Sequence, residues 1–149
     1  MNKCEILKDI RKSYHNLQSP DYGFVSAAVN GGKYLKIFNN LSSYGDLTDV
    51  TDLNDDVAFF WLLKPGGYKE GFLVQISMVG KYAVVVDLER SQDSCTVGKK
   101  LVRLLKSFGF YVFSYEELLE HVCDEISRGN LYYWLFSDVG MVPVNVISE

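Results

Sequence analysis

Three apolar segments in the middle of the chain constrain its fold more than any other feature of the sequence. Residues 57–63 form an uninterrupted, aromatic-rich apolar run, which is typical of a strand buried on both faces. Residues 72–78 and 82–88 are two further apolar runs, and a Pro-Gly-Gly turn and a short Gly-containing link separate the three segments. The spacing predicts an antiparallel meander of three strands.

Helical patterns precede this predicted meander. Asn2 can cap a helix over residues 3–17, in which apolar side chains recur at helical spacing. A shorter helix is predicted over residues 20–30, because its Ser-Pro-Asp start and Asn-Gly-Gly end are typical of helix boundaries. Residues 34–38 are interpreted as a strand, and residues 39–56 as a polar loop with at most one helical turn.

After the meander, helical and strand-like patterns alternate. Thr96 can cap a helix that Gly109 ends, and a short strand is predicted over residues 110–113. The remaining predicted elements are a helix that a capping box opens at residue 114 and Gly129 ends, and two closing strands over residues 131–136 and 142–147. We therefore expect one α+β domain over residues 1–149, in which a central, mainly antiparallel sheet carries the N-terminal helices and two later helices.

Composition excludes several classes of protein. Of the 149 residues, 48% are hydrophobic and 14% aromatic, which suffices for one buried core and is far from the composition of disordered chains. No apolar run reaches the roughly 18 residues of a membrane span, and the polar start lacks the apolar stretch of a signal peptide. Three cysteines without a disulfide-framework spacing favour a reducing compartment, so we expect a cytoplasmic protein that does not bind membranes.

The spacing of the potential metal ligands is not that of a metal site. His121 and Cys123 are two positions apart on a predicted helix, so they point to nearly opposite sides of it. The aspartates of residues 46–56 lack the alternating spacing, the central glycine and the closing glutamate of a helix–loop–helix calcium site. We therefore expect neither a metal nor a cofactor.

Cys95 is the best candidate for a catalytic nucleophile, because a helix N-terminus favours the thiolate form of a nearby cysteine. A thiol nucleophile also needs a base, and neither of the two histidines lies in a cysteine-hydrolase motif. The phosphatase pattern fails as well, since Leu101 stands where that pattern requires an arginine. We therefore expect no catalytic residues and no enzymatic activity. A small-molecule-binding or cysteine-dependent enzymatic domain stays open as the alternative.

The net charge of −4 conceals a segregation of charged residues along the chain. Residues 46–56 (the acidic segment) and residues 116–125 (the second acidic segment) each contain five acidic and no basic residues. Residues 97–110 contain four basic and no acidic residues, as the exposed face of an amphipathic helix requires. The acidic segments are either solvated faces or docking surfaces for a basic protein, whereas the overall acidity disfavours a nucleic-acid partner. The candidate partner-binding residues are Asp46, Asp49, Asp52, Asp55, Asp56, Glu116, Glu117 and Glu120.

The order of several short motifs resembles that of the SUKH superfamily. Ser-Pro-Asp-Tyr at residues 19–22 and Asn-Gly-Gly at residues 30–32 are similar to the family's Leu-Pro-x-x-Tyr helix that ends in Asn-Gly-Gly. The aromatic strand with Trp61 and the Pro-Gly-Gly turn come next, and Phe-Ser-Tyr-Glu-Glu-Leu-Leu at residues 113–119 resembles the family's late Ser-Phe-x-x-Phe-Leu helix. The chain departs from the family pattern where Ser19 replaces the usual leucine and a tyrosine replaces the first phenylalanine of the late motif.

The resemblance implies an α+β domain that binds protein and has no shared catalytic residues. Many bacterial members are cytosolic immunity proteins that neutralise toxin domains, often nucleases, delivered by neighbouring cells. We therefore expect a non-enzymatic immunity protein with a basic toxin as its partner, because domains that bind phosphate backbones carry positive charge. The acidic segment would then occlude the toxin, with Tyr44 or Tyr68 as aromatic anchors. A regulatory scaffold of the same superfamily would differ only in its partner.

Overall fold

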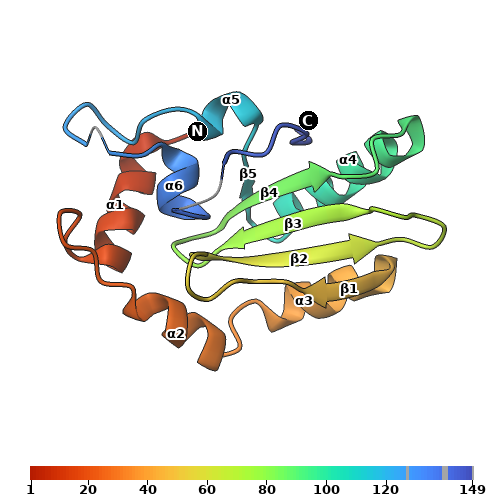
Figure 1. Cartoon of the computed structure of the whole chain (residues 1–149), viewed down its shortest axis with the longest axis horizontal. Coiled ribbons are helices and arrows are strands. Elements are labelled where there is room, and N and C mark those ends of the chain that lie inside the picture. Colours follow the sequence, from red (N-terminus) through yellow and green to blue (C-terminus); the bar gives the residue numbers. More distant parts are fainter. Residues whose placement is uncertain (127, 139–140, 149) are drawn as a thin grey trace.

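The three central apolar segments form the predicted antiparallel meander (Figure 1). Its strands are β2 (Ala58–Lys64), β3 (Phe72–Ser77) and β4 (Tyr82–Asp87). The computed structural model of the chain describes residues 1–126, 128–138 and 141–148. Every residue of β4 is buried, because this strand lies inside the sheet and α4 packs against it. The meander therefore forms the centre of the sheet, against which other elements pack.

Two short strands complete a five-stranded sheet with the order β1-β2-β3-β4-β5. β5 (Tyr111–Val112) pairs in parallel with β4 and confirms the strand predicted at residues 110–113. β1 (Asp46–Asp49) pairs antiparallel with β2 along its outer edge. The prediction of a loop over residues 39–56 is therefore wrong for this part. The polar sequence of β1 has weak strand propensity, but pairing with the edge of β2 outweighs it.

The two predicted N-terminal helices are confirmed, with shifted ends. α1 (Lys3–Tyr14) begins where Asn2 Oδ1 accepts a hydrogen bond from Glu5 N over 3.2 Å, and it ends three residues earlier than predicted. α2 (Gly23–Asn30) begins after the Ser-Pro-Asp sequence rather than within it. The reason is a local turn, in which Asp21 Oδ1 accepts a hydrogen bond from Gly23 N over 2.8 Å.

The strand predicted at residues 34–38 is wrong, because this segment belongs to the helix α3 (Leu35–Leu41). Ile37 and Leu41, one helical turn apart, are both buried, whereas Leu35 stays exposed. A 3₁₀ turn, η1 (Ser42–Tyr44), follows α3 and leads into β1. The short apolar run had indicated a buried strand, but its spacing also fits one face of a helix.

The predicted helix after the meander is confirmed as α4 (Gln92–Ser107), but Thr96 is not its cap. Ser91 caps the helix instead, through a capping box with Ser94. The buried Ser94 hydroxyl also donates a hydrogen bond to Asp87 Oδ2 over 2.7 Å, which ties the start of α4 to the end of β4. The helix therefore begins four residues before the predicted cap.

The elements that follow β5 differ most from the prediction. The predicted capping box is present and opens α5 (Tyr115–Leu118), but the helix makes a single turn and then gives way to turns. Its predicted continuation also includes residue 127, which lies outside the described residues. The strand predicted at 131–136 is wrong, because this segment forms the helix α6 (Leu131–Leu135). The segment 142–147 makes one bridge, between Val146 and Val86, rather than a closing strand.

One buried core joins the helices to the sheet and confirms the α+β class. At one end of it, the buried Tyr14 hydroxyl of α1 donates a hydrogen bond to the carbonyl of Trp134 in α6 over 2.6 Å. α1, α2 and α6 thus lie together beside one end of the sheet, whereas α4 lies against β4 and β5 (Figure 1). Within the described ranges, no helix is both long enough and apolar enough to cross a membrane.

Candidate functional site

An acidic groove separates α2 from the second half of the acidic segment. The groove encloses 330 Å³, and we define it by Tyr22, Val29, Leu53, Asp55 and Asp138. α2 contributes one wall, in which the apolar Val25 and Val29 lie one helical turn apart beside the polar Ser26 and Asn30. The opposite wall is formed by residues 53–57, and Asp138 approaches from the segment after α6. Three parts of the chain that are distant in sequence therefore form one surface.

Aspartate side chains shape the wall that carries the negative charge. Asp52 Oδ1 accepts a hydrogen bond from Asn54 N over 3.0 Å, and Asp56 Oδ2 accepts one from Asp52 N over 2.8 Å. Such bonds from a carboxylate to nearby backbone amides are the reason why Asp is frequent in tight turns. The spacing of the aspartates is therefore that of a chain of turns, which differs from the alternating pattern of a calcium loop.

Asp56, a predicted partner-binding residue, is buried in the fold. Only 8% of the residue is exposed, and its backbone forms an antiparallel bridge with Ser137. Burial raises the pKa of the Asp56 carboxyl, although hydrogen bonds from the Asp52 backbone and the Ser137 hydroxyl oppose this shift. Asp56 therefore fixes the floor of the groove and offers little surface to a partner.

In the groove, the pKa of Asp55 is raised by neighbouring groups. A hydrogen bond with Asp52 raises the pKa of the Asp55 carboxyl, and the negative charges of Asp52 and Asp138 act in the same direction. No basic side chain is among the described residues that line the groove. Like charges therefore face one another among the described residues of the lining, and Arg128 acts on the groove only at Tyr22, whose pKa its positive charge lowers.

Tyr22 connects the apolar wall to the acidic one. Its hydroxyl donates a hydrogen bond to Asp138 Oδ2 over 3.3 Å, and its ring packs edge-on against Tyr14 with 5.6 Å between the centroids. Burial and the neighbouring Asp138 raise the pKa of the Tyr22 hydroxyl. Sequence reasoning missed Tyr22 and Asp138 as site residues, because only the tertiary fold brings them together.

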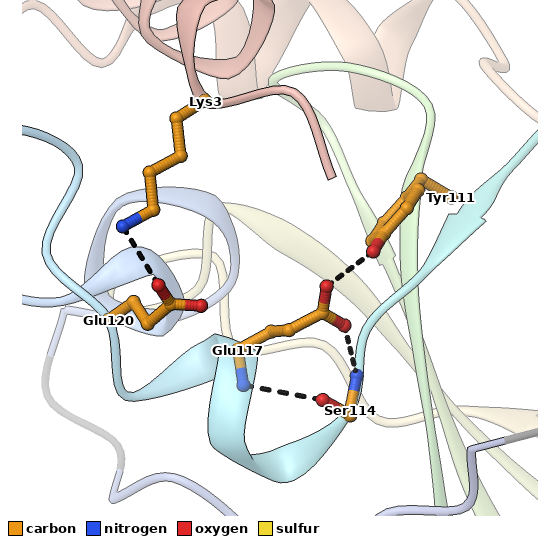
Figure 2. A network of polar contacts seen from close by, with 5 residues as sticks. All are labelled: Lys3, Tyr111, Ser114, Glu117 and Glu120. Carbon is orange, nitrogen blue, oxygen red and sulfur yellow. Dashed lines mark hydrogen bonds and ion pairs between the residues drawn. The ribbon is translucent and has the colours of Figure 1, made fainter.

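In the second acidic segment, Glu117 and Glu120 form polar contacts with other residues of the chain (Figure 2). Glu117 Oε1 accepts a hydrogen bond from Ser114 N over 3.0 Å, and Tyr111 donates its hydroxyl hydrogen to the other oxygen of Glu117. Burial would raise the pKa of Glu117, but the hydrogen bonds from Tyr111 and Ser114 outweigh it and lower the pKa. Glu120 forms an ion pair with Lys3 over 2.9 Å. Of the three predicted contact residues in this segment, Glu116 is exposed and makes no such contact with the described residues.

The two acidic segments do not form one surface. α5 lies at the top of the view in Figure 1, on the far side of the molecule from α2 at the bottom. Asp46 and Asp49 lie on β1 and are both exposed, at the edge of the sheet. The two predicted aromatic anchors differ in their contacts. Tyr44 is exposed, whereas Tyr68 donates its hydroxyl hydrogen to Asp93 and packs on Phe72.

The three free cysteines are exposed or partly exposed. Cys95 lies exposed in the first turn of α4, and neither histidine forms a hydrogen bond with it in the described part of the chain. Cys4 and Cys123 line a cavity together with His121. Among the described residues, no group of three or more histidine, cysteine, aspartate or glutamate side chains is arranged to hold a metal ion.

Comparisons with known proteins add no relative to this picture. No protein-family model matches the chain, and searches of curated proteins and of solved structures found no match.

Proposed function

We propose that this chain is a non-enzymatic binding module that holds a basic protein against the acidic groove. The observation that carries the proposal is the meeting of carboxylates and exposed apolar side chains in a single groove. Asp55 and Asp138 provide negative charge on two sides, and α2 provides an apolar wall. Protein interfaces combine the same two features, with an apolar centre and a polar rim.

Exposed apolar side chains support a protein partner. Leu53 is 56% exposed on one wall of the groove, and Tyr22 and Val29 on the opposite wall are 38% and 37% exposed. Single exposed apolar residues are common, but a cluster next to a concavity is typical of interaction sites. Tyr22 is well suited as an anchor, because tyrosine contributes large contact area and loses little side-chain entropy on binding.

The charges of the groove support a basic partner. In the free protein a hydrogen bond with Asp52 raises the pKa of Asp55, and repulsion from the negative charges of Asp52 and Asp138 adds to this shift. A lysine or arginine side chain that enters the groove would relieve this repulsion. Charge complementarity of this kind speeds association and discriminates against acidic partners.

We further propose that the basic partner is a toxin domain, which the protein neutralises by covering its substrate-binding face. The resemblance of the motifs to the SUKH superfamily supports this role, and so does the positive charge that nuclease domains need for phosphate backbones. Occlusion requires contact surface and no catalytic group.

The experiment combines copurification with an activity titration. The protein encoded by the adjacent reading frame is expressed together with this chain, and its toxic activity is then measured against increasing amounts of the purified chain. The proposal predicts a stable complex and complete inhibition at a one-to-one ratio. Inhibition at a small fraction of that ratio would indicate turnover, and the absence of both complex and inhibition would refute the toxin-neutralising role.

A further inference from the structure

A small aromatic pocket lies where the turn between α2 and α3 meets the outer edge of the sheet. It encloses 210 Å³, which is below the range of about 300–1,000 Å³ typical of sites for drug-sized ligands. Four aromatic residues line it, two from the helical side and two from β2. They are Tyr34, Phe38, Phe59 and Trp61. A pocket of this size suits one side chain of a partner.

The four rings form a continuous chain of contacts. The rings of Phe38 and Trp61 are nearly perpendicular, with 5.1 Å between their centroids, and those of Tyr34 and Phe59 are also nearly perpendicular at 6.2 Å. Phe59 and Trp61 connect the two pairs at 5.6 Å. Rings turned at right angles present faces as well as edges, and a ring face attracts a cation.

Asp49 supplies the carboxylate of the pocket. This exposed residue at the end of β1 belongs to the lining. Its Oδ1 accepts hydrogen bonds from Thr51 N over 3.0 Å and from the Thr51 hydroxyl over 2.6 Å, which hold the side chain in place. Its Oδ2 accepts no hydrogen bond within the described part of the chain, so one carboxylate oxygen stays available.

Lys33, which also lines the pocket, places an ammonium group against one of these rings. Its Nζ lies 5.2 Å from the centroid of the Tyr34 ring and donates a hydrogen bond to the carbonyl of Met78 over 3.2 Å. Burial lowers the pKa of Lys33. The Met78 carbonyl therefore holds this cation.

The backbone of Tyr34 is strained in a way that positions its ring. Its φ of +66° lies in the left-handed region, which is uncommon for a bulky residue. The Tyr34 hydroxyl donates a hydrogen bond to the carbonyl of Gly80 over 3.3 Å, and burial raises the pKa of this hydroxyl to about 12. Strain of this kind persists where the surroundings fix the residue, and it is concentrated at functional sites.

The pocket and the acidic groove are neighbours on one surface. Asn30, the last residue of α2, lines the groove, and Gly32 lines the pocket. On the other side, Asp49 in the pocket and Leu53 in the groove belong to the same short segment. A protein that covers the groove would therefore reach the pocket without a change of fold.

We propose that the aromatic pocket binds one alkylammonium group, the side chain of a lysine of the partner protein. This proposal rests on the proposed function for the identity of the partner, whereas the preference for alkylammonium groups is a property of the pocket alone. The aliphatic stem of a lysine packs against the rings, and its ammonium group meets ring faces and Asp49. A neutral side chain would gain no charge contact with Asp49.

The first test uses the protein without any partner. The ¹⁵N-labelled protein is titrated with n-butylammonium, n-butylguanidinium and n-butanol, and the indole N–H signals of both tryptophans are followed by NMR. We expect saturable shifts of the Trp61 signal with n-butylammonium, weaker effects of the other two compounds, and an unchanged Trp134 signal, since Trp134 lies in α6. Equal binding of n-butanol, or tighter binding of n-butylguanidinium, would overturn the assignment, as would the absence of any shift.

Two matched variants locate the effect and connect it to the partner. Asp49→Asn should weaken n-butylammonium binding about fivefold, as expected for the loss of one nearby charge from a partly exposed site. Asp46→Asn removes the same charge from the other end of β1, outside the pocket, and should leave binding nearly unchanged. Asp49→Asn should also weaken the complex with the partner. Full partner affinity in that variant would refute the lysine contact, even if the pocket binds the probe.

Discussion

The hydroxyl of Tyr22 donates a hydrogen bond to Asp138 Oδ2 over 3.3 Å and so connects residues that are 116 positions apart in the sequence. This contact joins the start of α2 to the segment that follows α6. It also closes one side of the acidic groove, whose other wall belongs to residues 53–57. The groove therefore exists only in the folded chain.

The first prediction concerns the pH dependence of stability. The pKa of Asp55 is raised in the folded protein, so the folded state holds a proton more firmly than the unfolded state, in which the pKa of aspartate is about 3.9. The free energy of unfolding should therefore fall as the pH rises from that value through the raised pKa of Asp55. Asp55→Asn should make this decline shallower and raise the urea midpoint at pH 7.

Urea unfolding at several pH values measures this effect. Glu116→Asn, which removes an exposed charge on α5, serves as the control and should leave the slope unchanged. The account would be contradicted if Asp55→Asn lowered the midpoint at pH 7 or left the pH slope as it is.

The second prediction concerns the contact between α1 and α6. Tyr14→Phe removes the buried hydroxyl that donates to the carbonyl of Trp134 and leaves this carbonyl without its partner. We expect a loss of about 1–3 kcal/mol in the free energy of unfolding. Tyr115→Phe is the control, since the hydroxyl of this partly buried residue makes no hydrogen bond within the described ranges. Equal losses in both variants would show that the contact contributes nothing specific.

The third prediction separates the observed cap of α4 from the one expected on sequence grounds. Ser94→Ala removes one half of the capping box and the bond to Asp87, so we expect a loss of about 1–3 kcal/mol. Thr96→Ala changes an exposed position inside the helix and should shift stability by less than about 0.5 kcal/mol. Thermal and urea unfolding of the two variants measure these losses. A larger loss of stability for Thr96→Ala than for Ser94→Ala would show that Thr96 is the cap of the helix.

The fourth prediction concerns Cys95 and the enzymatic alternative. Cys95 and Cys4 are both exposed, and no histidine forms a hydrogen bond with Cys95 within the described residues. The two thiols should therefore react with a disulfide reagent at similar rates at neutral pH. Variants that keep one of the two cysteines make the comparison direct. A reaction of Cys95 tenfold faster than that of Cys4 would favour the cysteine-dependent alternative.

The meander was predictable because each of its strands carries a long apolar run between turns, a pattern that few other structures share. Residues 131–135 were not, because their aromatic composition favours a strand. Asn130 nevertheless opens a helix there by accepting a hydrogen bond from Tyr133 N over 2.9 Å, and Trp134 then packs edge-on against Tyr14. Tertiary packing outweighed local propensity at this position.

The candidate site was predictable only in part. The sequence shows the run of aspartates, but it does not show that Asp56 is buried against Ser137 or that Glu120 is paired with Lys3. Both facts depend on which segments become neighbours in the fold. For the same reason, the apolar wall of α2 and the approach of Asp138 could not be inferred from a local pattern.

The central claim is that the charges of the acidic groove draw in a basic partner, and association kinetics test it most directly. The triple variant Asp52→Asn, Asp55→Asn, Asp138→Asn removes the charges of Asp55 and Asp138, which line the groove, and of Asp52, which acts on Asp55, and it keeps the buried Asp56. Its control is Glu116→Gln, Asp124→Asn, Glu125→Gln, which removes three exposed charges from the second acidic segment. Both variants are first checked for an unchanged unfolding midpoint or a raised one.

Stopped-flow mixing with the copurified partner at several salt concentrations then gives the association rate constant of each variant. We predict that the groove variant associates about tenfold more slowly at low salt and loses most of its salt dependence, whereas the control stays close to the unchanged protein. Equal rates and equal salt dependence for the groove variant and the unchanged protein would contradict the account.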